Sequence, residues 1–162
     1  MKKFLLLVCA AVISMSASAQ EGQKAVGFSL LYGSEIANVG LGVKGQYNLT
    51  NNLRGEAAFD YYLKKDGWSM WDINANMHYL FNVGRKITVY PLAGLGFVNV
   101  SFEAGDKDYV AVKSSKGRLG VNLGGGVDFA LTKNISLNGE LKYQFIDNFN
   151  QVVLGTGLNF KF

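Results

Sequence analysis

The only histidine of the chain, His78, is the first residue to test for chemistry. Beside a serine or a carboxylate, an imidazole could act as the general base of a hydrolase, with membrane lipid as the substrate. His78 stands, however, among the alternating polar residues of the segment Met70–Phe81, toward its end. This placement favours a histidine within a polar network, and we predict no catalytic residue and no enzyme activity.

Metal and cofactor sites are not indicated either. One histidine and a single cysteine near the N-terminus provide no zinc ligand cluster. The acidic residues Glu103, Asp106 and Asp108 lack the spacing of an EF-hand loop. The run Gly124-Gly125-Gly126 is not followed by the Gly-Lys-Ser/Thr of a phosphate-binding loop. We therefore predict no metal site and no cofactor.

The N-terminal segment has the features of a secretory signal peptide. Met1-Lys2-Lys3 is positively charged, Phe4–Ile13 is apolar, and Ala17-Ser18-Ala19 is a small-residue cleavage site. These features predict a signal peptide at residues 1–19 and one domain at residues 20–162. Cys9 falls inside the removed segment, so we expect no disulfide. A lipoprotein cysteine would need a small residue where Val8 stands.

Eight later segments alternate apolar with small or polar residues, which predicts β-strands. Most of them have the length that a tilted strand needs to cross a bilayer, about 9 to 11 residues. The segments are Lys24–Tyr32, Val39–Leu49, Leu53–Leu63, Met70–Phe81, Ile87–Ser101, Arg118–Leu131, Ile135–Phe145 and Gln151–Phe162. They predict an all-β fold, an eight-stranded antiparallel up-and-down transmembrane β-barrel.

The links between these segments alternate in length. Links rich in turn residues follow the second, fourth and sixth segments, and we expect them at the periplasmic end. They are Thr50–Asn52, Asn82–Arg85 and Thr132–Asn134. The outer links are Gly33–Asn38, Lys64–Gly67, Phe102–Gly117 and Ile146–Asn150, of which the third is the longest.

Aromatic residues on the apolar face cluster near the strand ends. A soluble lipocalin-type barrel would bury that face, and its core would not sort aromatic residues into two belts. Membrane interfaces favour such belts. The outer belt comprises Tyr32, Tyr61, Trp71, Phe97, Tyr143 and Phe145, and the periplasmic belt comprises Tyr47, Tyr79, Phe81, Phe129, Phe160 and Phe162. We therefore predict that the apolar face contacts lipid and that the polar face lines the lumen.

The polar face carries five cations and five anions, interleaved with glycines. An eight-stranded barrel is just wide enough for side chains to fill, so these charges should pair with one another. The predicted lumen charge network comprises Lys44, Arg54, Glu56, Asp60, Asp72, Arg118, Asp128, Glu140, Lys142 and Lys161. It predicts a packed, charge-balanced polar lumen rather than a wide aqueous pore.

Pro91 is the residue that fits a regular strand least well. Proline has no backbone N–H group, so it would leave a gap in the hydrogen-bond ladder of a closed barrel. We expect a bulge or distortion there, with a shift of the in/out phase as one consequence to test.

With these features the chain resembles the small OmpX-type and OmpA-type barrels, a family of outer membrane protein β-barrel domains. The C-terminal segment Leu158-Asn159-Phe160-Lys161-Phe162 contributes to the resemblance. In that family the last strand is the recognition signal for the barrel-assembly machinery, and Leu158, Phe160 and Phe162 occupy matching alternate positions. The resemblance implies a location in the cell outer membrane and this machinery as a partner. No periplasmic domain follows the last strand, so we expect no peptidoglycan anchoring.

Three functions remain open at this point. We favour a non-enzymatic barrel with a structural or surface-interaction role. A narrow porin-like channel for small solutes is the alternative, and a lipid-modifying enzyme is the least expected. We expect a monomer surrounded by outer-membrane lipid and lipopolysaccharide. The formal charge of +4 comes partly from Lys2 and Lys3 and indicates no nucleic-acid partner.

Overall fold

The computed structural model describes residues 22–35, 37–65, 68–104, 112–147 and 150–162. The predicted signal peptide, residues 1–19, lies outside the described residues. The strands are β1 (Lys24–Gly33), β2 (Asn38–Asn48), β3 (Leu53–Lys65), β4 (Trp68–Tyr79), β5 (Phe81–Asn82), β6 (Ile87–Ala104), β7 (Val112–Ala130), β8 (Ile135–Ile146) and β9 (Gln151–Lys161). Among the described residues there is no helix long and apolar enough to cross a membrane.

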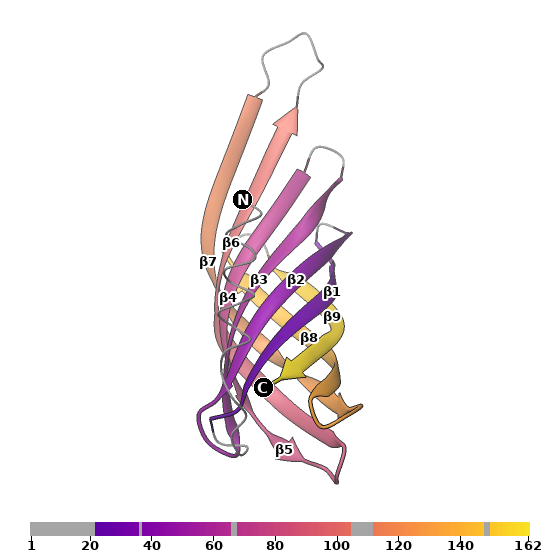
Figure 1. Cartoon of the computed structure of the whole chain (residues 1–162). Coiled ribbons are helices and arrows are strands. Elements are labelled where there is room, and N and C mark those ends of the chain that lie inside the picture. The colour runs from indigo at the N-terminus through magenta and orange to yellow at the C-terminus, as the bar shows by residue number, and fades with distance from the viewer. Residues whose placement is uncertain (1–21, 36, 66–67, 105–111, 148–149) are drawn as a thin grey trace.

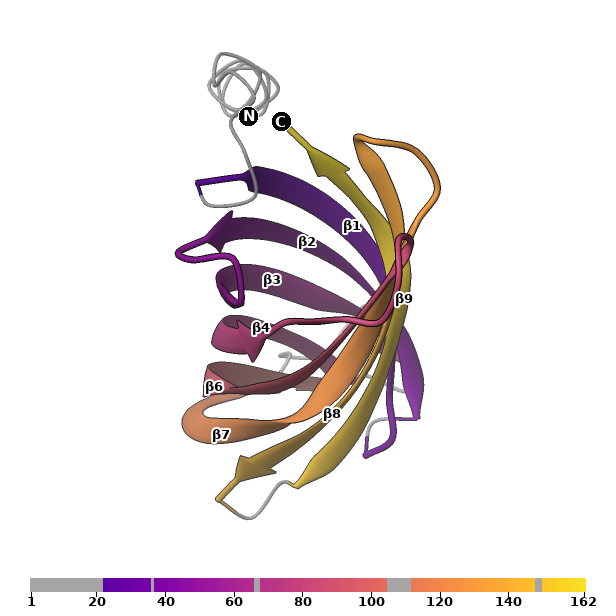
Figure 2. The same cartoon turned by 90° about the horizontal axis from the view of Figure 1, so that it is seen from below.

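The strands form one closed antiparallel barrel. Consecutive strands pair with each other except β4 and β5, which both pair with β6, and β1 pairs with β9 to close the sheet. The two-residue strand β5 continues the path of β4 beside β6, so the wall has eight strands. Figure 1 shows the tilted strands from the side, and Figure 2 shows from below how they curve around a common axis. The predicted eight-stranded β-barrel is confirmed.

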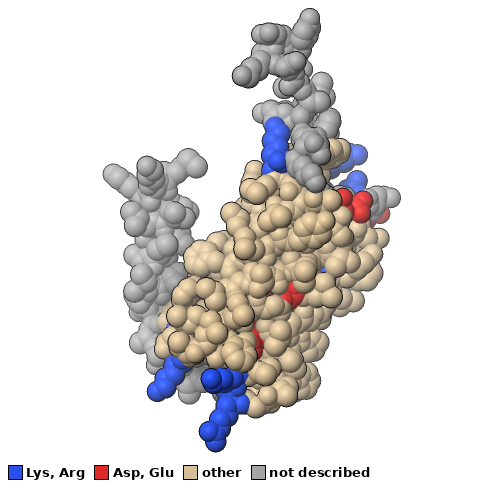
Figure 3. Space-filling model, turned by 90° about the vertical axis from the view of Figure 1, so that its right-hand side faces the viewer, with Lys and Arg blue, Asp and Glu red and all other residues tan. Residues whose placement is uncertain are grey.

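Burial alternates along the strands as the sequence pattern requires. On β2, for example, Lys44 and Gln46 are buried, whereas Val43 before them and Tyr47 after them are exposed. The outward side chains are mostly large and apolar, and the outer wall in Figure 3 is almost uncharged between its two ends. On this wall the Trp71 ring lies between Phe59 and Phe97, with centroid distances of 6.1 and 5.8 Å.

Two of the short turns share one sequence pattern and one geometry. In Leu49–Leu53 the Thr50 hydroxyl accepts hydrogen bonds from the backbone N–H groups of Asn52 (3.3 Å) and Leu53 (3.0 Å). In Leu131–Ile135 the Thr132 hydroxyl accepts from Asn134 and Ile135 at the same distances. This is the local bonding that favours Thr in turns.

Each of these turns also contacts a third strand. The Asn52 side chain donates to the Leu80 carbonyl (3.0 Å), and the Asn134 side chain donates to the Lys161 carbonyl (3.1 Å). In return the Leu80 and Lys161 N–H groups donate to the carbonyls of the same two asparagines, both at 2.7 Å. Each turn is therefore bonded both within itself and to the strand beside the hairpin.

Pro91 interrupts the ladder without shifting it. β4 pairs with β6 as far as His78 opposite Leu92, and pairing resumes in the same register with Phe81 opposite Val89. Tyr90 and Leu92 are both buried and Pro91 is exposed, so the in/out alternation continues through this point. The expected gap is present, but the expected bulge and phase shift are not. The register shift that the structure records between β3 and β4 lies elsewhere, between Tyr62 and Lys65.

The longest outer link is largely a hairpin rather than a loop. β6 continues to Ala104 and β7 begins at Val112, with regular pairing between them, so the predicted loop Phe102–Gly117 is mostly strand. β7 pairs with β8 only from Gly120 onward, and β6 pairs with β4 only up to Phe102. The β6–β7 hairpin therefore rises beyond the other strands, as Figure 1 shows at the top.

Candidate functional site: the polar lumen

The lumen is filled by side chains that stand on every second residue of the strands. Eight of the ten charged residues predicted for the network face this interior, and each has little accessible surface. They are Lys44, Arg54, Glu56, Asp60, Asp72, Asp128, Glu140 and Lys142. Their elements, β2, β3, β4, β7 and β8, lie around the circumference, so the side chains converge from different sides.

Arg54 on β3 organises the periplasmic half of the lumen. Its Nη1 donates to Asp128 Oδ2 at 2.7 Å, a short charge-assisted bond. Its Nε and Nη2 lie 3.2 and 3.0 Å from His78 Nδ1. Because a guanidinium only donates, Nδ1 must accept, and a neutral His78 carries its proton on Nε2. The His78 and Tyr90 rings are stacked at 4.5 Å, and Arg54 Cζ lies 4.7 Å from the Tyr90 centroid.

Lys44 on β2 bridges two carboxylates in the middle of the lumen. Its Nζ lies 3.5 Å from Glu56 Oε2 and 3.8 Å from Glu140 Oε2, and it donates to Asn138 Oδ1 at 2.7 Å. The two carboxylates accept further hydrogen bonds from Gln46, Asn76 and Tyr90. This cluster joins β2, β3 and β8, which are not all neighbours in the wall.

Lys142 on β8 faces a second pair of carboxylates. Its Nζ lies 3.4 Å from Asp60 Oδ2. Asp60 on β3 stands directly opposite Asp72 on β4 in the strand register. The Asn74 amide donates to both carboxylates, at 3.2 Å to Asp60 and 2.7 Å to Asp72. One ammonium group therefore serves two neighbouring carboxyl groups.

Amide side chains connect these clusters across the barrel. Asn122 on β7 donates to Asn74 and Asn76 on β4, at 2.9 and 3.0 Å. Gln144 on β8 donates to Asn74 at 3.2 Å, and Gln151 on β9 donates to Gln144 at 2.6 Å. These bonds join side chains of β4, β7, β8 and β9 across the interior, so they fill the cross-section rather than lining an open path.

Arg118 and Lys161 do not join the network inside the barrel. Arg118 of β7 is half-buried, and its side chain donates to the Asp147 carbonyl just beyond the outer end of β8. Lys161 of β9 lines a small cavity beside Arg54 and Asp128 at the periplasmic end. Without them the interior set has three cations, Lys44, Arg54 and Lys142, and five carboxyl groups. The expected charge balance therefore holds only when the two ends of the lumen are included.

Buried apolar clusters also lie inside the lumen near both ends, although the alternating pattern predicts a polar interior. The outer cluster consists of Leu31, Tyr62, Met70, Val98, Ile146 and Val153. The periplasmic cluster consists of Leu80, Tyr90 and Leu92. Between and beside these clusters lie cavities of about 20 and 50 Å³, lined by polar groups. The smaller has room for a single water molecule and the larger for a few.

Glu56, His78 and Glu140 form a grouping that the sequence did not reveal, because they stand on β3, β4 and β8. Each offers a potential metal-ligand atom, and these atoms all lie within 4.8 Å of one another. Their surroundings oppose a cation: Lys44 Nζ already occupies the side of both carboxylates. A metal on His78 Nε2 would also require a proton on Nδ1, which faces the donors of Arg54. The donor set fits an ion-pair network better than a metal centre.

The last strand carries the three residues of the expected assembly signal. Leu158 and Phe160 are exposed on the outer wall, and Phe162 is half-buried just beyond the end of β9. Phe28 of β1 meets Phe160 in an edge-to-face contact at 6.5 Å. The Phe162 N–H donates to the Lys24 carbonyl at 2.9 Å, so the C-terminus is held at the seam with β1.

Solved structures of outer-membrane proteins share this fold. The N-terminal β-barrel domain of OprF from Pseudomonas aeruginosa superposes with a TM-score of 0.71 at 17% identity, covering 88% of this chain and 98% of that one. Neisserial surface protein A gives 0.65 at 20% identity, covering 86% and 95%. Ail, the attachment invasion locus protein of Yersinia pestis, gives 0.64 at 15% identity, covering 88% and 99%. A search of curated proteins found no match.

A family model described as the outer membrane protein beta-barrel domain matches residues 5–162. The match spans nearly the whole chain and agrees with the closed barrel, the apolar outer wall and the polar interior. It indicates a location in the outer membrane. The chain belongs to the outer membrane protein β-barrel domain family.

Proposed function

We propose that this protein is a non-catalytic outer-membrane barrel with a sealed lumen and a structural or surface-interaction role. The cross-barrel network carries the proposal. Arg54, Lys44 and Lys142 each join strands from different sides of the wall, and the two cavities that the described residues enclose beside them measure only about 50 and 20 Å³. A solute path would require several buried ion pairs to separate together, which is costly in a low-dielectric interior.

The placement of His78 supports the non-catalytic part of the proposal. The ring is fully buried, and its Nδ1 faces the donors of Arg54. It stands opposite Leu92 near the periplasmic end of β4, far along the strand from the outer rim. A hydrolase acting on outer-leaflet lipid would need an accessible base at that rim.

The β6–β7 hairpin supports the surface role. It extends beyond the other strands, and at its base, where β6 is still paired with β4, Ser115 and Ser101 both donate to Asn99 Oδ1, at 2.9 and 3.2 Å. These bonds stiffen the base from which the two-stranded ribbon projects, and two strands alone are only marginally stable. A stiff ribbon outside the membrane is a suitable support for contacts with other molecules.

The expected partners belong to the same proposal. The outward apolar wall would contact outer-membrane lipid and lipopolysaccharide. Leu158, Phe160 and Phe162 would be read by the barrel-assembly machinery during insertion. The closed sheet offers no free edge within the spanning wall, which supports a monomer.

Conductance in planar bilayers tests the sealed lumen. We expect no stable conductance steps from the wild-type protein. In a background carrying Lys44→Ala and Lys142→Ala, which removes two cations of the network, the double variant Tyr62→Ala/Met70→Ala also opens the outer apolar cluster and should conduct measurably.

The matched control is Tyr61→Ala/Met77→Ala in the wild-type background. It removes the same side-chain types from the lipid-facing side of the same two strands, and it should remain closed. Stable ion-conducting steps from the wild-type protein would contradict the proposal and favour the narrow channel.

A further inference from the structure

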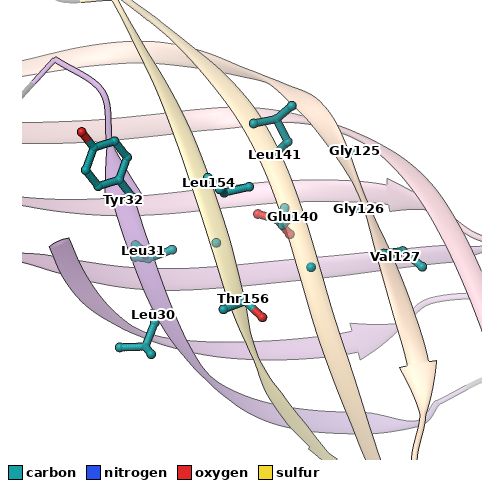
Figure 4. A pocket seen from close by; sticks show the side chains of 12 residues that line it. Leu30, Leu31, Tyr32, Gly125, Gly126, Val127, Glu140, Leu141, Leu154 and Thr156 are labelled. Carbon is teal, nitrogen blue, oxygen red and sulfur yellow. The ribbon is translucent and has the colours of Figure 1, made fainter. Parts of the chain in front are cut away.

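The outer wall has a hollow of about 610 Å³ that spans β1, β9, β8 and β7. Figure 4 shows its lining residues distributed over these four strands. The volume lies in the range of binding sites for small ligands, roughly 300–1,000 Å³. The hollow opens on the face that contacts lipid, and at its floor it reaches Glu140 of the lumen network.

The strand register explains how the hollow arises. Two rows of outward residues cross these four strands side by side. The first row is Val127, Gly139, Thr156 and Leu30, and the second is Gly125, Leu141, Leu154 and Tyr32. Each row has one glycine, at Gly139 on β8 and Gly125 on β7. The missing side chains leave space between the large apolar residues around them.

The two glycines differ in whether the fold itself requires them. A Cβ at position 125 would lie 2.9 Å from the Tyr90 carbonyl oxygen, so the close approach of β6 requires glycine there. A Cβ at position 139 would meet only Val127 Cγ1, at an ordinary 3.7 Å. The fold therefore does not require glycine at position 139, although glycine weakens a strand interior. Glycine in a strand often marks a place where a ligand approaches the backbone closely.

The lining is mostly apolar and suited to an apolar chain, with Glu140 as its one charged residue, and the Glu140 carboxylate is already engaged by Lys44 and Tyr90. Leu30, Leu141 and Leu154 are all exposed on the outer wall around the hollow. The Thr156 hydroxyl, which also faces outward, donates to the Asn138 carbonyl at 3.1 Å, so its donor is already satisfied. When the hollow is empty, the side chains that line it lose dispersion contacts. Water does not replace these contacts, because a bound water needs about two to four polar partners and the hollow offers few.

We propose that this hollow binds one acyl chain of a phospholipid from the surrounding bilayer, seated against the Gly139 backbone between β7 and β9. The position in the spanning wall makes bilayer lipid the occupant, and the glycine lets the chain sink below the level of the neighbouring leucines. The site would hold this lipid more tightly than the flat parts of the wall hold theirs.

The test fills the hollow without disturbing the barrel. Gly139→Val places an apolar side chain in open space, and Gly139→Ala does so with less bulk. Gly45→Val is the matched control, because an added Cβ at this outward glycine of β2 also meets nothing within 4 Å and Gly45 does not line the hollow. Each variant is refolded into dimyristoylphosphatidylcholine nanodiscs, and its folded state is checked by gel mobility without heating.

Native mass spectrometry then measures the fraction of protein released with one phospholipid bound. A loss of contact with about two methylene groups corresponds to about a tenfold change in affinity. We expect the one-lipid fraction to fall strongly in Gly139→Val, to fall less in Gly139→Ala and to stay at the wild-type level in Gly45→Val. Equal fractions in the wild type and Gly139→Val would overturn the proposal.

A second measurement avoids the release step. In the same nanodiscs, nuclear Overhauser effects from lipid methylene protons to the Gly139 amide should be strong in the wild-type protein. They should exceed those to the Gly45 amide on β2. Equal effects at both glycines would also overturn the proposal.

Discussion

Lys142 is the residue on which the outer half of the lumen most depends. Its ammonium group is almost fully buried and faces Asp60, with Asp72 opposite Asp60 on the next strand. Breaking a buried pair by removing one partner leaves an uncompensated charge, which typically costs more than the pair itself contributes.

We expect Lys142→Met to destabilise the barrel by about 3–5 kcal/mol, because it leaves both carboxyl groups without their cation. Urea unfolding in lipid vesicles, followed by tryptophan fluorescence, measures the effect. Lys133→Met in the exposed β7–β8 turn is the control and should change the unfolding free energy by less than about 0.5 kcal/mol. A similar small change in both variants would show that Asp60 and Asp72 do not need Lys142.

At the residue scale, alternation predicts which face a side chain occupies but not how deep it lies. Arg118 and Lys161 have the same phase as the interior cations, yet they stand near strand ends and remain at the two ends of the lumen. The grouping of Glu56, His78 and Glu140 depends on the tilt and register of three strands. No spacing within the sequence carries that information.

Each spanning strand presents an apolar face to the membrane. The cost of placing a charged residue on this face should depend on its depth in the bilayer. Val43 is midway along β2 and is exposed between Phe28 and Phe59 of the neighbouring strands. Leu49, also exposed, lies in the turn that follows the same strand. The two positions allow one substitution to be compared at two depths on one element.

We expect Val43→Arg to cost about 2–4 kcal/mol and Leu49→Arg about 0–1 kcal/mol, because the arginine charge meets hydrocarbon only at the first position. Urea titrations in phospholipid vesicles measure both free energies of unfolding. If both variants lose the same stability, the outward face of β2 is not in contact with the membrane core.

At the element scale, the sequence located all eight strands but misjudged two features. Pro91 was expected to cause a bulge, yet its missing N–H falls where β4 gives way to β5, so a gap without slippage accommodates it. The segment 102–117 was expected to be a loop because its polar residues give no clear alternation. Regular pairing of β6 with β7 overrides this weak local preference.

The closed sheet as a whole depends on the seam between β1 and β9, which joins strands from opposite ends of the chain. Gly157 lies in this seam, and a Cβ there would overlap the Phe28 carbonyl oxygen of β1. The barrel can therefore close only if position 157 has no side chain between the backbones of β1 and β9.

We expect the refolded wild-type barrel to migrate differently on SDS gels before and after boiling, because a closed barrel resists the detergent. Gly157→Val should lose the unboiled form, whereas Gly45→Val, with no neighbour within 4 Å of the added Cβ, should retain it. A heat-sensitive mobility shift in Gly157→Val equal to that of the wild type would show that closure does not depend on this seam.

The two Thr-x-Asn turns have a consequence for the order of assembly. Because Asn52 bonds to Leu80 and Asn134 bonds to Lys161, neither turn is complete until a third strand has arrived. Formation of β2, β3 and the β4–β5 junction is thereby coupled, as is formation of β7, β8 and β9. The chain would then enter the membrane as three-stranded cooperative units rather than as separate hairpins, and the second unit ends at the C-terminus.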